Sequence, residues 1–328
     1  MDTLKSYFKD DFLIGAAVNK ASIDLDRTLL TEQFNSITAE NEMKFENIHP
    51  EKDRYDFSNS DYFLEVAKAN GIALRGHTLV WHNQTPAWFF EDENGHAVSR
   101  EILLERMQAH IETVVGRYKG QIYAWDVVNE AISDEEGVFF RPSKWLEIIG
   151  EDFIDHAFRF AHAADPTAKL FYNDYNESNP GKREKIYTLI KGMKARGIPI
   201  HGMGLQAHWN LYDPSLLDIE TAIERYSECG VELHITEMDV SMFRFDDKRT
   251  DLIEPTKDML EAQAQRYQDF FKLFLKHRAK ITSVTFWGIS DRYTWLSDFP
   301  VKGRKNWPFL FDTNNQPKPA YDRVLDIK

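Results

Sequence analysis

Short apolar runs alternate with stretches of helical periodicity eight times along this chain, and this alternation limits the fold more than any other feature of the sequence. The runs predicted as strands are Leu13–Val18, Ser36–Ala39, Ala73–Val80, Tyr123–Val128, Leu170–Tyr172, Met203–Gln206, Glu232–Thr236 and Ser283–Trp287. Each run is followed by enough chain for the crossover helix that parallel strands require. We therefore predict an α/β fold, a single (β/α)8 barrel domain over residues 1–328, rather than an open sheet with a second domain.

The stretches between the strands carry apolar residues every three or four positions. One stripe runs through Leu103, Met107 and Ile111, behind an N-cap candidate at Ser99. The other predicted helices are Leu25–Phe34, Ser60–Asn70, Ser143–Ala164, Gly181–Arg196, Ser215–Cys229, Asp258–His277 and Pro319–Asp326. Three of these helices are followed by a candidate C′ glycine, at Gly71, Gly197 and Gly230.

Charge and composition exclude several classes of partner. The chain has 40 Lys and Arg against 53 Asp and Glu, and the net charge of −13 disfavours phosphate backbones and anionic lipid. The single cysteine, Cys229, can form no internal disulfide, and we expect a buried, inert thiol. The N-terminus lacks the apolar region of a secretory signal, and no long apolar run suggests a membrane span. We expect a cytoplasmic protein with a neutral substrate and no nucleic-acid, membrane or protein partner.

Polar side chains follow the predicted strands at their carboxyl ends, where the active sites of such barrels lie. The sets are Glu40-Asn41-Glu42-Met43-Lys44, His77 with Trp81-His82-Asn83-Gln84, Asn129-Glu130, Asn173-Asp174-Tyr175-Asn176, Gln206-Ala207-His208, Glu237-Met238-Asp239, and Trp287. Amides and carboxylates bind hydroxyl groups, and indole rings pack against C–H faces. The pattern is typical of a sugar-binding site.

Two glutamates, Glu130 and Glu237, each end an apolar strand, and the two strands lie across the predicted barrel from each other. Acetal hydrolysis needs one carboxyl group that is protonated near neutral pH and one that is ionised. Two like charges close together raise the pKa of one of them, which separates the two roles. We therefore predict that Glu130 and Glu237 are the catalytic pair.

Metal catalysis is the main competing chemistry. A ligand set could be assembled from His77, His82, His208, Asp239 and His201. However, the sequence has no closely spaced His-Glu-His motif and no cysteine ligand at a strand end. We therefore expect neither a metal nor another cofactor.

The strand-end motifs together resemble those of glycoside hydrolase family ten, the endo-1,4-β-xylanases. The matching segments span nearly the whole chain: Thr38–Lys44, Gly76–His82, Trp125–Glu130, Asn173–Asn176, Gln206–His208, Ile235–Asp239 and Thr285–Trp287. The resemblance implies a barrel, retention of the anomeric configuration and no metal. It also supplies xylan or xylo-oligosaccharides as the substrate.

The resemblance also implies roles for individual residues. Glu237 would be the nucleophile that forms a covalent xylosyl intermediate, and Glu130 would be the acid and then the base, with the carboxyl groups roughly 5–5.5 Å apart. Asn129 would bind the sugar 2-hydroxyl. His208 would contact the nucleophile, and Asp239 would hydrogen-bond His208.

Further residues resemble the sugar-binding positions of the family. The implied set comprises His77, Trp81 and Gln84 around subsite −1, Glu40, Asn41 and Lys44 at subsite −2, Trp287 and Trp295 above the glycone subsites, and Asn173 and Tyr175 on the aglycone side. Gln206 is a further substrate-binding candidate. Asp126 and His82 would support this lining from behind. Trp295 would crowd the hydroxymethyl group that glucose carries and xylose lacks.

The chain resembles the compact intracellular members of the family, since it shows neither a secretion signal nor an attached carbohydrate-binding module. We therefore expect it to act mainly on short xylo-oligosaccharides. Two alternatives stay open at this point. One is a barrel that binds sugars without turning them over, and the other is the same machinery with a shifted substrate, such as a β-1,4-glucan or an aryl β-xyloside.

Overall fold

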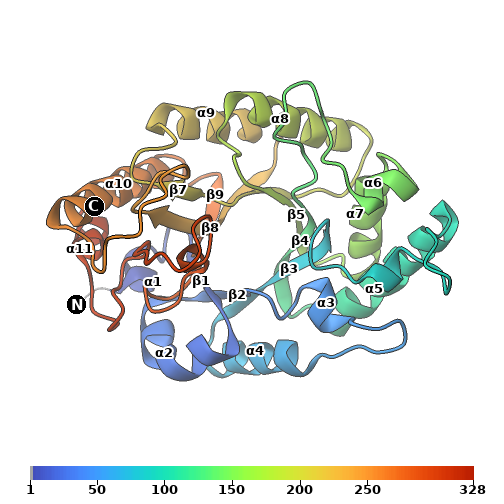
Figure 1. Cartoon of the computed structure of the whole chain (residues 1–328), viewed down its shortest axis with the longest axis horizontal. Helices are drawn as coiled ribbons and strands as arrows, with labels where there is room; N and C mark the ends of the chain where they lie inside the picture. The colour runs from blue at the N-terminus through green and yellow to red at the C-terminus, as the bar shows by residue number, and fades with distance from the viewer. Residues whose placement is uncertain (1–2) are drawn as a thin grey trace.

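The computed structural model describes residues 3–328 and shows a closed barrel of parallel strands surrounded by helices (Figure 1). The strands are β1 (Leu13–Val18), β2 (Ser36–Ala39), β3 (Ala73–Trp81), β4 (Ile122–Asn129), β5 (Lys169–Asp174), β6 (Gly202–Leu205), β7 (His208–Asn210), β8 (Glu232–Ser241) and β9 (Ile281–Phe286). They pair in the order β6-β5-β4-β3-β2-β1-β9-β8-β7, and a further pairing of β6 with β8 closes the ring. The predicted (β/α)8 fold is confirmed.

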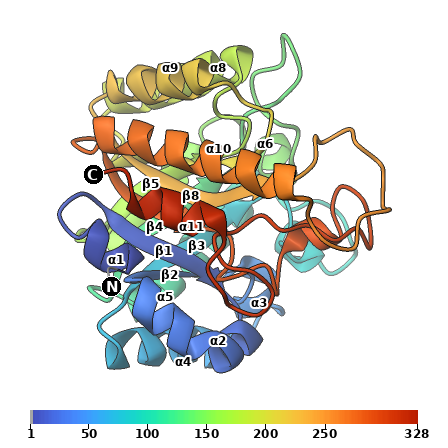
Figure 2. The same ribbon diagram turned by 90° about the vertical axis from the view of Figure 1, so that its left-hand side faces the viewer.

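Helices cover the outside of the barrel (Figure 2). They are α1 (Leu4–Tyr7), α2 (Lys20–Gln33), α3 (Phe45–Ile48), α4 (Ser58–Ala69), α5 (Arg100–Arg117), α6 (Lys144–Ile149), α7 (Phe153–Ala164), α8 (Pro180–Ala195), α9 (Leu216–Ser227), α10 (Lys257–Lys276) and α11 (Pro319–Leu325). The Ser99 hydroxyl caps α5 by accepting from the Ile102 N–H, as the sequence predicts. No helix within residues 3–328 is long and apolar enough to span a membrane.

Three predictions about local structure were wrong. The single helix predicted over 143–164 is interrupted at Gly150, whose φ of 102° is not helical, and it forms α6 and α7. Strand β8 extends to Ser241, and its upper half pairs with the unpredicted short strand β7. The thiol of Cys229 is half-buried rather than buried, and burial raises its pKa.

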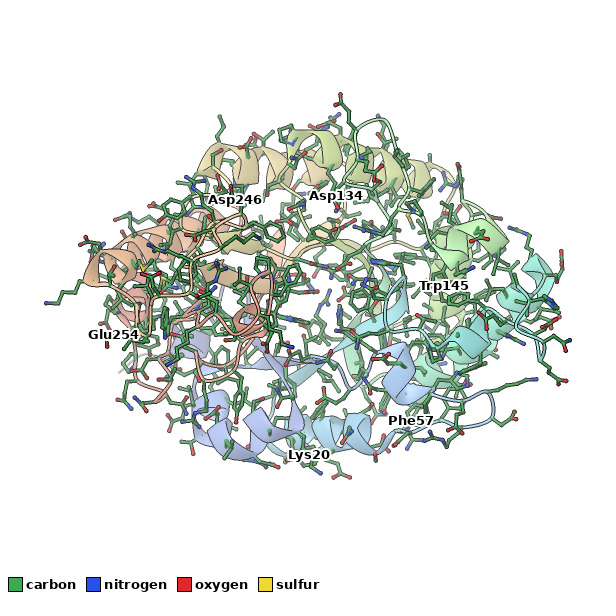
Figure 3. The ribbon with its side chains drawn as sticks, viewed as in Figure 1. Lys20, Phe57, Asp134, Trp145, Asp246 and Glu254 are labelled. Atoms are coloured by element: carbon green, nitrogen blue, oxygen red, sulfur yellow. The ribbon has the colours of Figure 1, made fainter. Side chains whose placement is uncertain are left out.

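Side chains fill the inside of the ring, so the barrel has a packed core rather than a channel (Figure 3). Gly76 on β3 makes room for the fully buried indole of Trp125, because a Cβ at this position would lie 2.2 Å from Trp125 Cε3. Arg75, the residue before Gly76, faces the opposite side of β3, and its buried guanidinium forms a two-bond ion pair with Asp126. Burial alone would raise the pKa of Asp126, but the charge of Arg75 lowers it to about 2. The barrel interior therefore holds a buried ion pair of Arg75 and Asp126.

Candidate active site

Glu237 lies on β8 with 5% of its surface exposed, and both of its carboxylate oxygens are hydrogen-bonded. Oε1 accepts a bond of 2.9 Å from Asn173 Nδ2, and Oε2 lies 2.9 Å from His208 Nε2. Burial alone would raise the pKa of this carboxyl group, but the hydrogen bond with His208 and the charges of His77 and His208 outweigh it and lower the pKa. The site therefore favours the ionised form of Glu237.

His208 joins two carboxylates. Its Nδ1 lies 2.9 Å from Asp239 Oδ2, opposite the contact of Nε2 with Glu237. Burial lowers the pKa of His208, but the charge of Asp239 and the hydrogen bonds to both carboxylates raise it well above the usual value. The site therefore favours the imidazolium form of His208, which can donate to both Asp239 and Glu237. Trp295 Nε1 also donates to Asp239 Oδ2, over 2.8 Å.

Glu130 follows β4 and is in a different environment. Its Oε2 accepts a bond of 2.8 Å from Trp81 Nε1, and its Oε1 accepts one of 3.0 Å from Gln206 Nε2. Both donors are neutral. Burial raises the pKa of Glu130, and the charges of Asp174 and Glu237 raise it further against the hydrogen bond from Gln206. The site therefore favours the protonated form of Glu130.

The backbone at Glu130 turns with a φ of 58°, in the left-handed region that few residues other than glycine adopt. Three sets of hydrogen bonds hold this turn. The Glu130 N–H donates to the Asn173 carbonyl, and Arg141 Nε donates to the Glu130 carbonyl. The N–H groups of the next two residues, Ala131 and Ile132, both donate to the hydroxyl of Tyr172.

Three amide side chains connect the two glutamates. Asn173 Nδ2 donates to both Glu237 Oε1 and Asn129 Oδ1, and Gln206 Nε2 donates to both Glu130 Oε1 and Asn129 Oδ1. Asn173 has no exposed surface, and its Oδ1 accepts from the Thr236 hydroxyl. Asn173, for which an aglycone contact was predicted, therefore has its side-chain amide hydrogen-bonded to Glu237, Asn129 and Thr236.

The predicted subsite −1 residues lie on both sides of the glutamates. His77 Nδ1 lies 2.8 Å from Asp126 Oδ2, and His77 Nε2 lies 3.9 Å from Glu237 Oε1. The Trp287 ring meets the His77 ring edge-on at 5.4 Å. Trp81 provides the hydrogen bond to Glu130 already described. The structure therefore brings these residues together, and Asp126 holds the His77 ring through Nδ1.

A second group of predicted residues lies further out along the mouth. Lys44 Nζ donates to Asn41 Oδ1 over 3.0 Å, and it lies 4.9 Å from the centre of the Trp81 ring. Burial lowers the pKa of Lys44. Glu40 accepts from Asn19 over 3.3 Å, and burial raises the pKa of this carboxyl group. These groups form one polar edge beside Trp81.

The remaining predicted residues are at the rim. Gln84 Nε2 donates to Glu46 rather than to either catalytic candidate. His82 packs edge-on against Trp81, and burial together with nearby Arg141 lowers the pKa of His82 to about 4, so the ring is neutral. Tyr175 is partly exposed beside Glu130.

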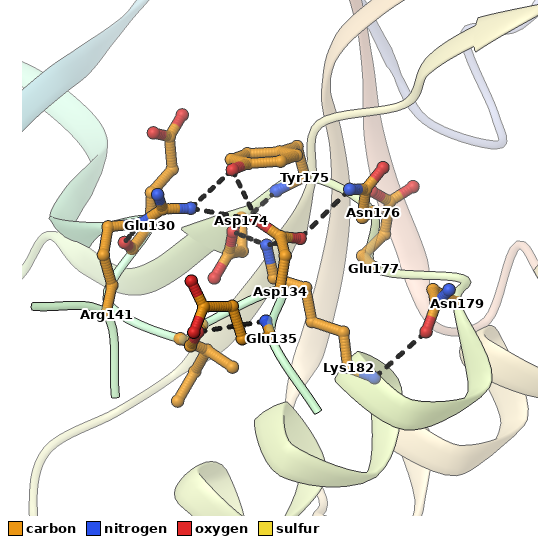
Figure 4. A network of polar contacts seen from close by, with 12 residues as sticks. Glu130, Asp134, Glu135, Arg141, Asp174, Tyr175, Asn176, Glu177, Asn179 and Lys182 are labelled. Carbon is orange, nitrogen blue, oxygen red and sulfur yellow. Dashed lines mark hydrogen bonds and ion pairs between the residues drawn. The ribbon is translucent and has the colours of Figure 1, made fainter. Parts of the chain in front are cut away.

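Sequence reasoning missed a charged cluster next to Glu130 (Figure 4). Lys182 Nζ, on α8, contacts Asp174 Oδ1 at 2.8 Å and Asp134 Oδ1 at 3.0 Å. Arg141 donates to Asp134 and to the hydroxyl of Tyr175. No local pattern marks Lys182 or Arg141, since their partners come from other elements of the barrel.

The side chains of the alternative metal set are not arranged as metal ligands within residues 3–328. His201 Nδ1 accepts from the Leu170 N–H near the start of β5, at the opposite end of the barrel from Glu237. His77 Nδ1 and both ring nitrogens of His208 are engaged with carboxylates. The side chains at the mouth therefore form hydrogen-bond chains between acids and imidazoles, rather than a set of nitrogens converging on one point.

Comparison with known proteins places this geometry in a family. A family model described as glycosyl hydrolase family 10 matches residues 3–327. An endo-1,4-β-xylanase from Geobacillus stearothermophilus is 56% identical over 327 residues, which cover 99% of this chain and 98% of that protein. Endo-1,4-β-xylanase B from Paenibacillus barcinonensis is 54% identical over 323 residues, which cover 98% of this chain and 97% of that protein.

Solved structures agree with this placement. The crystal structure of a xylanase from Paenibacillus barcinonensis complexed with a conduramine derivative has a TM-score of 0.98 and 54% identity, and the match covers 100% of this chain and 99% of that chain. The structure of a mutant protein in complex with xylotriose has a TM-score of 0.97 and 48% identity, and the match covers 99% of this chain and 100% of that chain.

Proposed function

Because the chain belongs to glycosyl hydrolase family 10 and is an endo-1,4-β-xylanase, we propose that it cleaves xylosidic bonds by double displacement, with Glu237 as the nucleophile and Glu130 as the acid and then the base. The observation that carries this proposal is the contrast between the two carboxyl groups. An imidazolium lowers the pKa of Glu237, whereas burial and two neighbouring carboxylates raise that of Glu130. Double displacement needs this division of roles.

In the first step, an oxygen of Glu237 attacks the anomeric carbon while Glu130 gives its proton to the departing glycosidic oxygen. A xylosyl ester of Glu237 forms, and the aglycone leaves as an alcohol. In the second step, Glu130 is ionised and removes a proton from water as the water attacks the same carbon. The negative charge of Glu237 raises the pKa of Glu130, and ester formation removes that charge. The pKa of Glu130 therefore falls in the intermediate, which favours the ionised form that the second step needs.

Asn129 is proposed to bind the sugar 2-hydroxyl. Its Oδ1 already accepts two hydrogen bonds from protein amides, while its Nδ2 has no protein partner among residues 3–328. The amide is therefore fixed in one orientation with a donor available to substrate. A hydrogen bond to this hydroxyl that strengthens at the transition state would contribute to the rate rather than only to binding.

The other sugar contacts are proposed from the same geometry. The polar edge of Glu40, Asn41 and Lys44 would bind hydroxyl groups at subsite −2. The Trp295 ring is fixed on one side by Asp239 and is stacked on Phe299 at 5.1 Å, so it would restrict bulky substituents at the glycone subsites.

We further propose that residues 1–328 form one catalytic domain, that the protein acts in the cytoplasm, and that its main substrates are short xylo-oligosaccharides. Turnover per active site on xylotetraose should exceed that on polymeric xylan. Equal turnover on the two substrates would contradict the proposed preference.

The stereochemistry of the first product tests the mechanism. Proton NMR should show the β-anomer before mutarotation, and an initial α-anomer would rule out Glu237 as a nucleophile. Replacing Glu237 by alanine should abolish turnover on every substrate. Glu130→Ala should lose about 10²–10⁴-fold on natural oligosaccharides, yet retain cleavage of aryl glycosides whose leaving group needs no proton.

A further inference from the structure

Asp174, the last residue of β5, carries a buried carboxylate that the proposed mechanism does not use. Asp174 has no exposed surface. Its Oδ2 accepts a hydrogen bond of 2.5 Å from the Tyr172 hydroxyl, and its Oδ1 accepts one of 2.9 Å from the Tyr175 N–H. Lys182, whose side chain is 2% exposed, is its ion-pair partner. Such a buried charge is costly, and neighbouring groups must stabilise it.

Asp174 is linked to Glu130 through the backbone. Strands β4 and β5 are paired up to Asn129 and Asn173, so Glu130 and Asp174 are the next residues on adjacent strands. The Tyr172 hydroxyl that donates to Asp174 accepts from the N–H groups of Ala131 and Ile132, immediately after Glu130. Asp174 thereby fixes the orientation of the hydroxyl that holds the strained turn at Glu130.

Asp174 also acts on the Glu130 carboxyl through its charge. Among the causes that raise the pKa of Glu130, the charge of Asp174 follows burial and precedes the charge of Glu237. Asp174 therefore has a larger effect on the proton of Glu130 than the nucleophile has.

We propose that Asp174 is a positioning residue for the acid/base carboxyl of Glu130, acting through Tyr172 on its backbone and through its own charge on its side chain. This inference rests on the proposed role of Glu130. It assigns to Asp174 no contact with substrate. It also gives a reason for the lysine buried on α8 against this strand end: burial raises the pKa of Asp174, and the charge of Lys182 and its contact with Asp174 oppose that rise.

The effect of Asp174 has to be considered together with the other charges that face Glu130. These are Lys44 from the loop after β2, His82 after β3, Arg141 from the loop after β4, and Glu237 on β8. His82 is neutral because its pKa is about 4. The remaining three keep their charge when Asp174 is replaced by Asn, so the change in the field at Glu130 comes from Asp174.

The experiment is the pH dependence of kcat/KM for xylotetraose, whose basic limb reports the loss of the Glu130 proton in the free enzyme. Asp174→Asn should move this limb to lower pH by about 1 unit. Asp134→Asn is the matched control. It removes another carboxylate from the same Lys182 ammonium, but the Asp134 side chain is 36% exposed and its charge is screened by water. The basic limb of this control should stay in place.

A merely structural role for Asp174 would lower activity at every pH without moving the limb, and that result would overturn the proposal. If Asp174→Asn does not fold, the double variant Asp174→Asn/Lys182→Met removes both members of the buried pair. It should shift the limb in the same direction but by less, because the loss of the Lys182 charge opposes the loss of the Asp174 charge. The Glu130→Ala variant distinguishes a failure of the proposed function from a failure of the proposed role of Asp174. If the limb survives in Glu130→Ala, the proposed function fails, whereas an unmoved limb in Asp174→Asn with loss of the limb in Glu130→Ala refutes only the role of Asp174.

Discussion

Replacing His208 by glutamine tests the idea that a cationic partner keeps Glu237 ionised. The Gln amide can still donate to Glu237, so the substitution removes mainly the positive charge between Glu237 and Asp239. A hydrogen bond from a charged group contributes about 1.5–3 kcal/mol, against about 1 kcal/mol for a neutral one. The difference of about 1–2 kcal/mol corresponds to a rise of roughly 1 unit in the pKa of Glu237.

The sign of the effect follows from the form of Glu237 that reacts. The nucleophile must be ionised, so raising its pKa moves the acidic limb of kcat/KM to higher pH by roughly 1 unit and removes activity selectively at low pH. The assay should use an aryl xylobioside with a good leaving group, because its cleavage does not depend on the proton of Glu130. His201→Gln, at the far end of the barrel, is the control and should leave the limb in place. If the acidic limb of His208→Gln also stays in place, the electrostatic argument for Glu237 is refuted.

Two further predictions concern stability. Asp126→Asn should be strongly destabilising at pH 7 because it leaves buried Arg75 unpaired, and the difference from the parent should shrink near pH 2. The reason is that the depressed pKa of Asp126 contributes about 2 kcal/mol to the free energy of unfolding; this contribution is present above pH 4 and is lost as pH falls toward 2. Urea unfolding of the parent and the variant at pH 7 and at pH 3 measures the difference. Gly76→Ala should lower the free energy of unfolding by about 1–3 kcal/mol, since the new Cβ would overlap the rigid Trp125 indole. Gly116→Ala, at a helical position with open space around the new Cβ, should instead be neutral or raise it by up to about 1 kcal/mol, and the opposite ranking of the two alanines would contradict the packing argument.

The strands were the most predictable part of the fold. Strands β1 and β2 have the predicted bounds, because each is a short apolar run between polar segments. The predicted helix over 143–164 was wrong because the pattern of apolar residues continues through the break, and only Gly150 marks it. Strand β7 was missed because it contains three residues and follows Ala207, whose φ of 61° separates it from β6.

The site was predictable in its members but only partly in its contacts. Glu130 and Glu237 could be selected because each follows an apolar run predicted as a strand, although β8 continues past Glu237 to Ser241. The direction of a side chain at a strand end is harder to predict, and the hydrogen bonds of Asn173 to Glu237 and Asn129 could not be inferred from the sequence. Lys182 was not considered at all, since its partner Asp174 is on a different element and nothing near it in sequence indicates burial.

Covalent trapping tests the central claim most directly. A xylobioside with fluorine in place of the 2-hydroxyl and a good leaving group forms the ester but hydrolyses it slowly, so the labelled chain can be digested and its peptides analysed by mass spectrometry. The proposed mechanism predicts one fluoroglycosyl group per chain, attached to Glu237. A label on Glu130 or on any other residue, or complete turnover without a trapped ester, would contradict it.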